Sequence, residues 1–125
     1  SAPPAPPPAL VEIMSLIEEE WTDGSAEADG YVALGACAAA NLADVGCASL
    51  VADSGLLEVC AHLVAEAEDP AVLLYACSAV QNALADPGVA ADVRVAAALR
   101  AVRLGARLAR VAEMATAAGR GEADP

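Results

Sequence analysis

The chain contains nearly the same short sequence twice, about forty residues apart. Residues 36–44 read ACAAANLAD, and residues 76–86 read ACSAVQNALAD. Both copies begin with Ala-Cys, carry an asparagine near the end and finish with Ala-Asp. Self-similarity at this period is typical of chains that stack one helical unit on the next, because a single unit cannot bury its apolar face alone. The repetition therefore predicts an architecture, not a motif that carries a chemical reaction.

The composition favours helices over strands. Alanine, which has the highest helix propensity, supplies much of the apolar fraction of 58%. Phe is absent, and β-branched residues are scattered, not clustered as in strands. With 125 residues, the chain is long enough for one domain with its own core. We expect an all-α fold with a helical domain at 10–118, between a Pro-rich arm or linker at 1–9 and a flexible tail at 119–125.

Glycines, prolines and acidic residues mark the expected helix boundaries. Asp69-Pro70 and Asp86-Pro87 each place a capping side chain directly before a proline at the first helical position. Trp21 follows Leu10 by eleven residues on the apolar face of the first helix, so we expect it in the core. The expected helices cover residues 10–21, 26 or 31 to 43, 56–67, 70–84, 89–94 and 96–118, and residues 47–55 form a short helix or a turn.

This order of long and short helices resembles the armadillo repeat, or the wider armadillo/HEAT class. Residues 41–86 carry the likeness: Gly55 ends a short helix, Leu56-Leu57 begins a second, and Asp69-Pro70 begins a third. Asn41-Leu42-Ala43 matches the ending of the family's third helix. The resemblance implies a right-handed α-solenoid of three-helix repeats, with one full unit flanked by two partial units. It also implies a non-catalytic protein-interaction or scaffold module that binds a partner segment or subunit in a groove lined by third helices.

The polar side of the third helix in the full unit is the predicted groove surface. The candidate contact residues are Asn41, Tyr75, Ser78, Gln81 and Asn82. In the nuclear-import adaptors of the family, a tryptophan precedes the asparagine by four residues, but Cys37 and Ser78 stand at those positions here. The extra residue in the second copy, Gln81, also turns its asparagine by ~100°. Two roles stay open for the asparagines: hydrogen bonds to neighbouring backbone, or contact with a different extended ligand.

The net charge of −12 is distributed unevenly along the chain. Residues 1–93 contain no Arg or Lys, and all six arginines lie within residues 94–125. So acidic a surface would repel phosphate, which argues against nucleic-acid binding. It suits a basic protein partner, or charge pairing between one end of the molecule and its own acidic surface.

Four of the arginines would share one face of the helix expected at 96–118. At ~100° per residue they fall within an arc of roughly 80°. This charged contact stripe consists of Arg100, Arg103, Arg107 and Arg110. Guanidinium groups suit bidentate contacts with carboxylate or phosphate. We expect the stripe to pair with acidic faces of the preceding unit or of another subunit, and an acidic partner or lipid headgroups are the alternative.

The four cysteines are not spaced as a zinc site. Structural zinc usually takes pairs two to four residues apart, whereas these cysteines are separated by 10, 13 and 17 residues. We expect core packing for them, with a disulfide and a metal or redox role as the lesser alternatives. They are Cys37, Cys47, Cys60 and Cys77.

His62 is the only histidine, with Glu58 and Glu66 at i−4 and i+4. A histidine beside carboxylates can act as a general base or a metal ligand, but the sequence offers no nucleophile or second ligand near it. We therefore expect a surface histidine, no metal, no cofactor and no enzymatic activity.

No run of about 18 uninterrupted apolar residues occurs, so we expect no transmembrane segment. Thiols without disulfides suit a reducing intracellular compartment, either the cytoplasm or an organelle after removal of a targeting peptide. Neither end of the expected solenoid carries an obvious polar cap. The alternative to an interaction module is therefore a structural accessory subunit buried in a large multiprotein complex, for which an organelle is one candidate setting.

Overall fold

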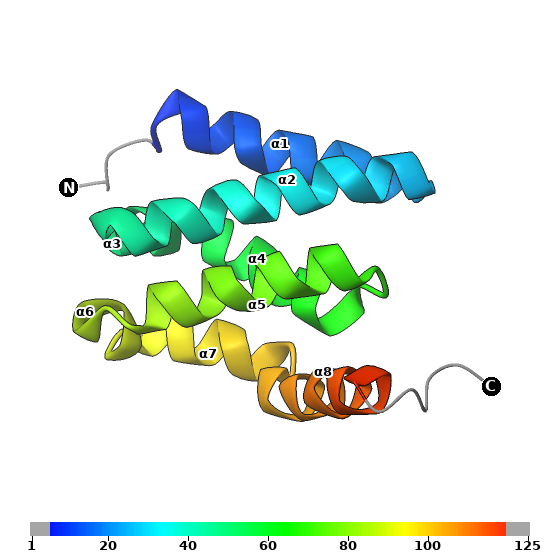
Figure 1. Ribbon diagram of the computed structural model, residues 1–125. Coiled ribbons are helices and arrows are strands. Elements are labelled where there is room, and N and C mark those ends of the chain that lie inside the picture. The colour runs from blue at the N-terminus through cyan, green and yellow to red at the C-terminus, as the bar shows by residue number, and fades with distance from the viewer. Residues whose placement is uncertain (1–5, 120–125) are drawn as a thin grey trace.

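The computed structural model describes residues 6–119, and every element within that range is helical, so the all-α prediction is confirmed. Figure 1 shows the helices stacked from α1 at the top to α8 at the bottom. A π-helical turn, Ala43–Cys47, joins α2 to α3 through a kink at Val45 and Gly46. The helices are α1 (Pro8–Asp23), α2 (Ala26–Leu42), α3 (Ala48–Asp53), α4 (Leu56–Glu66), α5 (Pro70–Leu84), α6 (Pro87–Ala90), α7 (Val93–Ala101) and α8 (Leu104–Gly119).

Side-chain caps fix the starts of several helices. The Asp69 carboxylate accepts hydrogen bonds from the N–H groups of the second and third residues of α5, both at 3.1 Å, and Pro70 precedes them. Asp86 caps α6 in the same way, and Ser25 accepts from the third residue of α2. The first N–H groups of a helix have no partner within the helix, so each cap determines where its helix begins. The predicted starts at Pro70 and after Asp86 follow from this local chemistry.

The single long helix expected at 96–118 is wrong, because the chain breaks it into α7 and α8. α7 ends at Ala101 and α8 begins at Leu104. In the turn between them Arg103 has a left-handed backbone with a φ of 52°, and its N–H donates to the carbonyl of Arg100 at 3.0 Å. The two turn residues, Val102 and Arg103, are neither glycine nor proline, and the helical spacing of alanines and arginines continues through them. The short helix expected at 89–94 covers Pro87–Ala90 instead, so it begins where Asp86-Pro87 predicts and ends before Val93, the first residue of α7.

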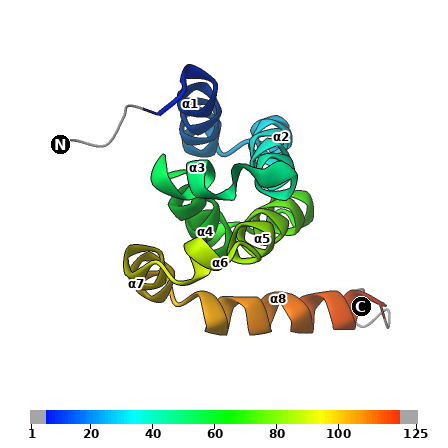
Figure 2. The same ribbon diagram turned by 90° about the vertical axis from the view of Figure 1, so that its left-hand side faces the viewer.

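Neighbouring helices pair in layers along the stack. α1 packs on α2, α4 packs on α5, and the most extensive contact between layers joins α2 to α5. Figure 2 shows α2 and α5 on one side of the molecule and α1, α4 and α7 on the other. α8 contacts α4 and α7, and it runs crosswise in Figure 2, where the other long helices are seen end-on. The side formed by α2 and α5, called the α2–α5 face below, is therefore an outer surface of the stack.

Small side chains let the helices approach closely in the core. Alanines supply many of the buried positions of α2 and α5, while larger buried side chains such as Val32, Leu56 and Leu57 fill the space between layers. Gly35 of α2 lies against Ile17 of α1, and a Cβ at this glycine would come within 2.6 Å of Ile17 Cγ1. Within residues 6–119 no buried side chain is charged or polar, so apolar burial holds the layers together.

Trp21 does not pack in the core as its helical spacing predicts. Its side chain is 40% exposed, although Leu10 and Ile17 on the same face of α1 are buried. The indole lies in the last turn of α1 and lines a cleft between α1 and α4. Helical spacing places Trp21 on the apolar face of α1, but its burial depends on whether a neighbouring helix covers that end of the face. The packing of α1 on α2 leaves the indole ring partly uncovered.

Candidate partner-binding face

The α2–α5 face presents leucines at equivalent positions of its two helices. Leu34 in α2 is 63% exposed, Leu74 in α5 is 61% exposed, and the two stand forty residues apart, which is the period of the sequence repeat. Tyr31, about one turn before Leu34, is also exposed. Single exposed apolar residues are ordinary on protein surfaces. Here the same residue recurs at the same place on neighbouring helices, which favours a contact surface over chance exposure.

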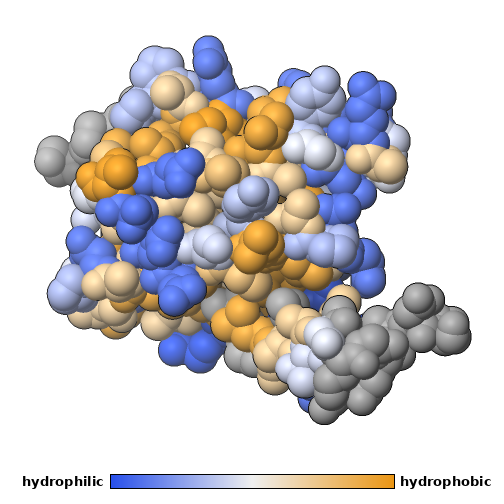
Figure 3. Space-filling model, in the orientation of Figure 1, coloured by the Kyte–Doolittle hydropathy of each residue, from blue (hydrophilic) through white to orange (hydrophobic). Residues whose placement is uncertain are grey.

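Each of these leucines is followed two helical turns later by an exposed amide. Asn41 stands seven residues after Leu34, and Gln81 stands seven residues after Leu74, so each amide shares a helix face with its leucine. Figure 3 shows hydrophilic side chains gathered at the left of this face, around the C-terminal ends of α2 and α5, and largely apolar surface along its middle. The two helices therefore carry two matching leucine–amide rows.

Asn82 is half-buried whereas Asn41 is exposed, although both asparagines match the armadillo-like helix ending by residue type. The Asn82 side chain is half-buried, and its Nδ2 donates to the backbone carbonyl of Ala40 in α2 at 3.0 Å. This bond is the first of the two roles that the sequence leaves open for the asparagines. The extra residue in the second copy puts Gln81, not Asn82, at the exposed position equivalent to Asn41. The Asn41 Nδ2 lies 3.8 Å from the sulfur of Cys37 within its own helix.

The other predicted groove residues contribute less exposed surface. Tyr75 is half-buried and packs against the core, and the Ser78 hydroxyl donates back to the carbonyl of Leu74 at 2.9 Å. Leu34 and Leu74 are absent from the predicted contact residues because the prediction follows the polar side of the third helix, which does not include them. Applying the forty-residue period to apolar residues as well as polar ones would have found both leucines.

The predicted arginine stripe is divided by the break between α7 and α8. Its members are Arg100 in α7, Arg103 in the turn, and Arg107 and Arg110 in α8. Arg107 docks on the C-terminal end of α4, where its Nε donates to the carbonyl of Val64 at 2.8 Å and its Nη2 to that of Ala67 at 2.7 Å. Carbonyls at a helix C-terminus lack intrahelical donors and carry partial negative charge, so the guanidinium satisfies both. Arg107 thus contacts the preceding layer through backbone carbonyls instead of the acidic side chains that we expected.

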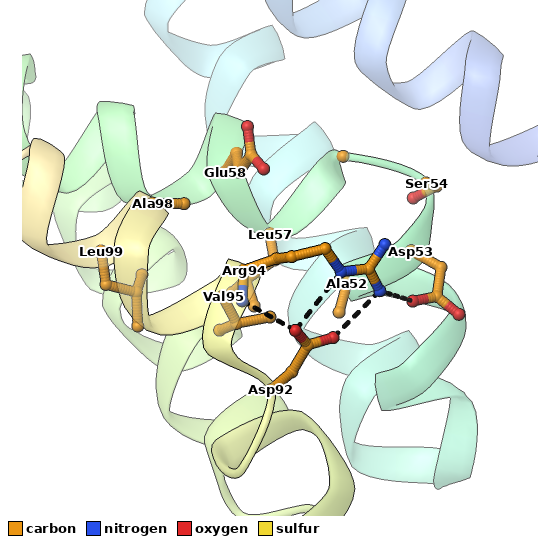
Figure 4. Close-up of a pocket in the computed structure, with 11 residues that line it drawn as sticks. Ala52, Asp53, Ser54, Leu57, Glu58, Asp92, Arg94, Val95, Ala98 and Leu99 are labelled. Atoms are coloured by element: carbon orange, nitrogen blue, oxygen red, sulfur yellow. Dashed lines mark hydrogen bonds and ion pairs between the residues drawn. The ribbon is translucent and has the colours of Figure 1, made fainter.

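A second cationic side chain joins α7 to the end of α3. Figure 4 shows Arg94 between Asp92 and Asp53, beside a cavity of about 200 Å³. Its Nη2 is 3.0 Å from Asp92 Oδ2 and 3.7 Å from Asp53 Oδ1. Hydrogen bonds from the Arg94 side chain and backbone lower the pKa of Asp92, and the same side-chain bond raises the pKa of Arg94. Because the Arg94 side chain is 78% exposed, we assign it to orienting Asp92 as the N-cap of α7, not to a ligand site.

Histidine and cysteine residues do not converge in the part of the chain that the structure describes. That part contains no group of three or more His, Cys, Asp or Glu side chains that could hold a metal ion. His62 is exposed, as expected, and it lines the cleft between α1 and α4. Cys60 is buried in the core, as predicted, whereas Cys37, Cys47 and Cys77 are half-buried.

One helical stretch has the length and composition to cross a membrane. It is Ala26–Asp53, 28 residues that run from α2 through α3. This stretch bends at Val45 and Gly46, and many of its residues pack in the core cluster. Core helices of soluble proteins pass the same test of length and composition, so the absence of a transmembrane segment stays a prediction.

Comparisons of the chain with family models, curated proteins and solved structures find no match. The armadillo resemblance therefore rests on the helix-end residues within 41–86. Function has to be argued from the surface itself, and the α2–α5 face offers apolar contact area together with side-chain amides.

The buried thiol of Cys60 should make stability depend on alkaline pH. Burial raises the pKa of this thiol from 9.0 to about 12, so the unfolded chain loses the proton at lower pH than the folded protein does. The free energy of unfolding should be constant at pH values below 9.0, the pKa in the unfolded chain. Between this pH and about 12, the pKa in the folded protein, it should fall by up to about 1.4 kcal/mol for each pH unit. Urea unfolding at a series of pH values measures the slope. In Cys60→Ala the part of the slope caused by this thiol should disappear. An unchanged slope in this variant would contradict the raised pKa of Cys60 as its cause.

Proposed function

We propose that this chain is a non-catalytic protein-interaction module that binds a segment of a partner protein along the α2–α5 face. The observation that carries the proposal is the pair of matching rows, Leu34 with Asn41 and Leu74 with Gln81. The leucines supply apolar area to bury, and the amides can both donate and accept hydrogen bonds. An apolar centre beside polar groups is the usual anatomy of a protein–protein contact. Such a face works by complementarity and needs no reactive group.

We also propose that the stack is a short right-handed solenoid of armadillo-like three-helix units. The order of a short helix and two longer ones in α3, α4 and α5 recurs in α6, α7 and α8, and α1 with α2 would be the last two helices of a preceding unit. The break between α7 and α8 supports this reading and extends it, because the last unit, expected to be partial, then has separate second and third helices. Asn82 bonded to α2 and Arg107 bonded to α4 would then be ties between successive units.

A structural subunit of a larger assembly is the second candidate. It is favoured by apolar side chains exposed outside the α2–α5 face, some of them on the terminal helices of the stack. They include Val11 in α1, Val93 in α7, and Leu108 and Met114 in α8. Neighbouring subunits would cover such residues, and the isolated chain would then self-associate or be marginally stable.

The test replaces both leucines of the face, as Leu34→Ser with Leu74→Ser. Val93→Ser is the matched control, because Val93 is 79% exposed but lies on α7. We expect the double variant to bind its stoichiometric partner at least about tenfold more weakly, since two anchors lose their apolar area. Affinity capture from the native extract identifies the partner, and titration with that purified partner measures the change.

Three outcomes separate the candidates. Loss of binding in the double variant alone supports the α2–α5 face. Full binding by a double variant with normal helix content would overturn it. Loss of binding in Val93→Ser alone, together with self-association of the isolated chain, would favour the structural subunit instead.

A further inference from the structure

A separate cleft lies between α1 and α4, and Figure 2 places these helices on the side of the stack away from α2 and α5. Its floor includes Ile17 and Leu63, which are 1% and 3% exposed, with Val59 beside them. The cleft has a volume of about 280 Å³, below the roughly 300–1,000 Å³ of small-molecule pockets. A cleft of this size has room for one long side chain of a partner protein.

The rim of the cleft combines an exposed aromatic ring with carboxylates. Glu18 and Trp21 come from α1 at i and i+3, and His62 and Glu66 come from α4 at i and i+4, so each helix supplies a ring and a carboxylate one turn apart. The indole is 40% exposed. The face of an indole attracts cations, and neighbouring carboxylates strengthen that attraction.

We propose that this cleft receives an arginine side chain from a partner protein, at a site separate from the α2–α5 face. The apolar floor accommodates the methylene stem, while the guanidinium stacks on Trp21 and pairs with Glu18 and Glu66. Charge complementarity selects this occupant, because the lining of the cleft includes no Arg or Lys and, in the described part of the chain, neither Glu18 nor Glu66 takes part in an ion pair.

The chain's own arginines lie on another side of Glu66. Arg103, Arg107 and Arg110 line a depression with Glu66 toward α8, and the guanidinium of Arg107 is already bonded to carbonyls of α4. The cleft itself is lined by residues of α1 and α4, and His62 is the basic side chain among them.

The proposal also accounts for the acidic run Glu18-Glu19-Glu20 near the end of α1. Carboxylates in the last turns of a helix face its negative end, which is unfavourable unless a cation offsets it. A bound guanidinium between Glu18 and Trp21 would supply that cation and would cover the exposed indole.

Trp21 is the only tryptophan, so tryptophan emission, excited selectively over the two tyrosines, reports on this cleft. The probe is the peptide acetyl-Ala-Arg-Ala-amide, titrated at constant ionic strength. We expect a saturable change in Trp21 emission. The same peptide with citrulline, which keeps the shape but not the charge, and the peptide with glutamate should give none.

Variants locate the binding. Glu18→Gln with Glu66→Gln should weaken binding of the arginine peptide by about tenfold. Glu12→Gln, an exposed carboxylate on α1 outside the cleft, should leave binding unchanged, and so should Leu34→Ser with Leu74→Ser. Trp21→Leu should lose binding of the arginine peptide while keeping its helix content. Because this variant has no tryptophan emission, its binding is followed by the NMR resonances of the ring of His62, the only histidine, which lines the same cleft.

The proposal is overturned by any of three results: no saturable change, equal binding of the citrulline peptide, or equal weakening by Glu12→Gln. The second result would indicate apolar contact alone, and the third a general effect of surface charge. Because the leucine variants leave this cleft intact, failure here is distinguishable from failure of the α2–α5 face.

Discussion

Replacing Gly35 with leucine should destabilise the folded chain by about 3 kcal/mol. Gly35 is buried in α2, and a Cβ there would lie 2.6 Å from Ile17 Cγ1 and 3.0 Å from its Cδ1. Ile17 has little room to move, because it is β-branched and 1% exposed. A leucine must therefore separate α1 from α2 or force Ile17 out of its rotamer. Urea unfolding followed by circular dichroism measures the change.

Gly30, in the same helix, provides the matched control. It is exposed, and a Cβ there would meet nothing within 4 Å in the described part of the chain. Gly30→Leu should be neutral or stabilise the chain by up to about 0.8 kcal/mol, because leucine has the higher helix propensity. Adding Ile17→Ala to Gly35→Leu should recover part of the loss, since it vacates the space that leucine needs. Equal effects of leucine at the two glycines would contradict the close α1–α2 contact.

Helix starts could be predicted because their causes are local. Asp69 caps α5 with N–H groups only two and three residues away, so the sequence contains everything that the cap requires. The break after Ala101 could not be predicted in this way. Arg103 adopts a left-handed backbone, which costs about 1 kcal/mol or more and persists only where other contacts outweigh it. The bonds from Arg107 to the end of α4 are such contacts, and they join residues about forty positions apart.

The candidate face could be placed from the sequence, but its residues could be assigned only in part. Matching by residue type pairs Asn82 with Asn41, whereas the forty-residue helical register pairs Gln81 with Asn41 and leaves Asn82 to bond with α2. The period of a helix also shows which residues share a face, but not which neighbour covers it. Trp21 shares the face of buried Ile17 and still lines an open cleft for that reason.

Replacing Arg107 with alanine should loosen α8 from the stack and lower the free energy of unfolding by roughly 3 kcal/mol. The variant removes two hydrogen bonds from a charged donor, at 2.8 Å to Val64 and 2.7 Å to Ala67. These two residues are 0% and 1% exposed, so water cannot readily replace the lost donor. Bonds of this kind contribute about 1.5–3 kcal/mol each, and the partial exposure of the guanidinium keeps the expected sum near the lower end.

The first consequence should be local, because α8 packs on α4 and α7 at the end of the stack. Hydrogen exchange of the α8 amides should quicken at denaturant concentrations where the amides of α2 and α5 remain protected. Arg110→Ala, an exposed arginine in the same helix, is the matched control and should change neither exchange nor stability appreciably. Arg107→Lys should give exchange rates and a stability between those of Arg107→Ala and Arg110→Ala. Lysine keeps the positive charge but lacks the planar guanidinium that donates to both carbonyls at once. Equal exchange in Arg107→Ala and Arg110→Ala would mean that apolar contacts hold α8, and the left-handed turn at Arg103 would then need another cause.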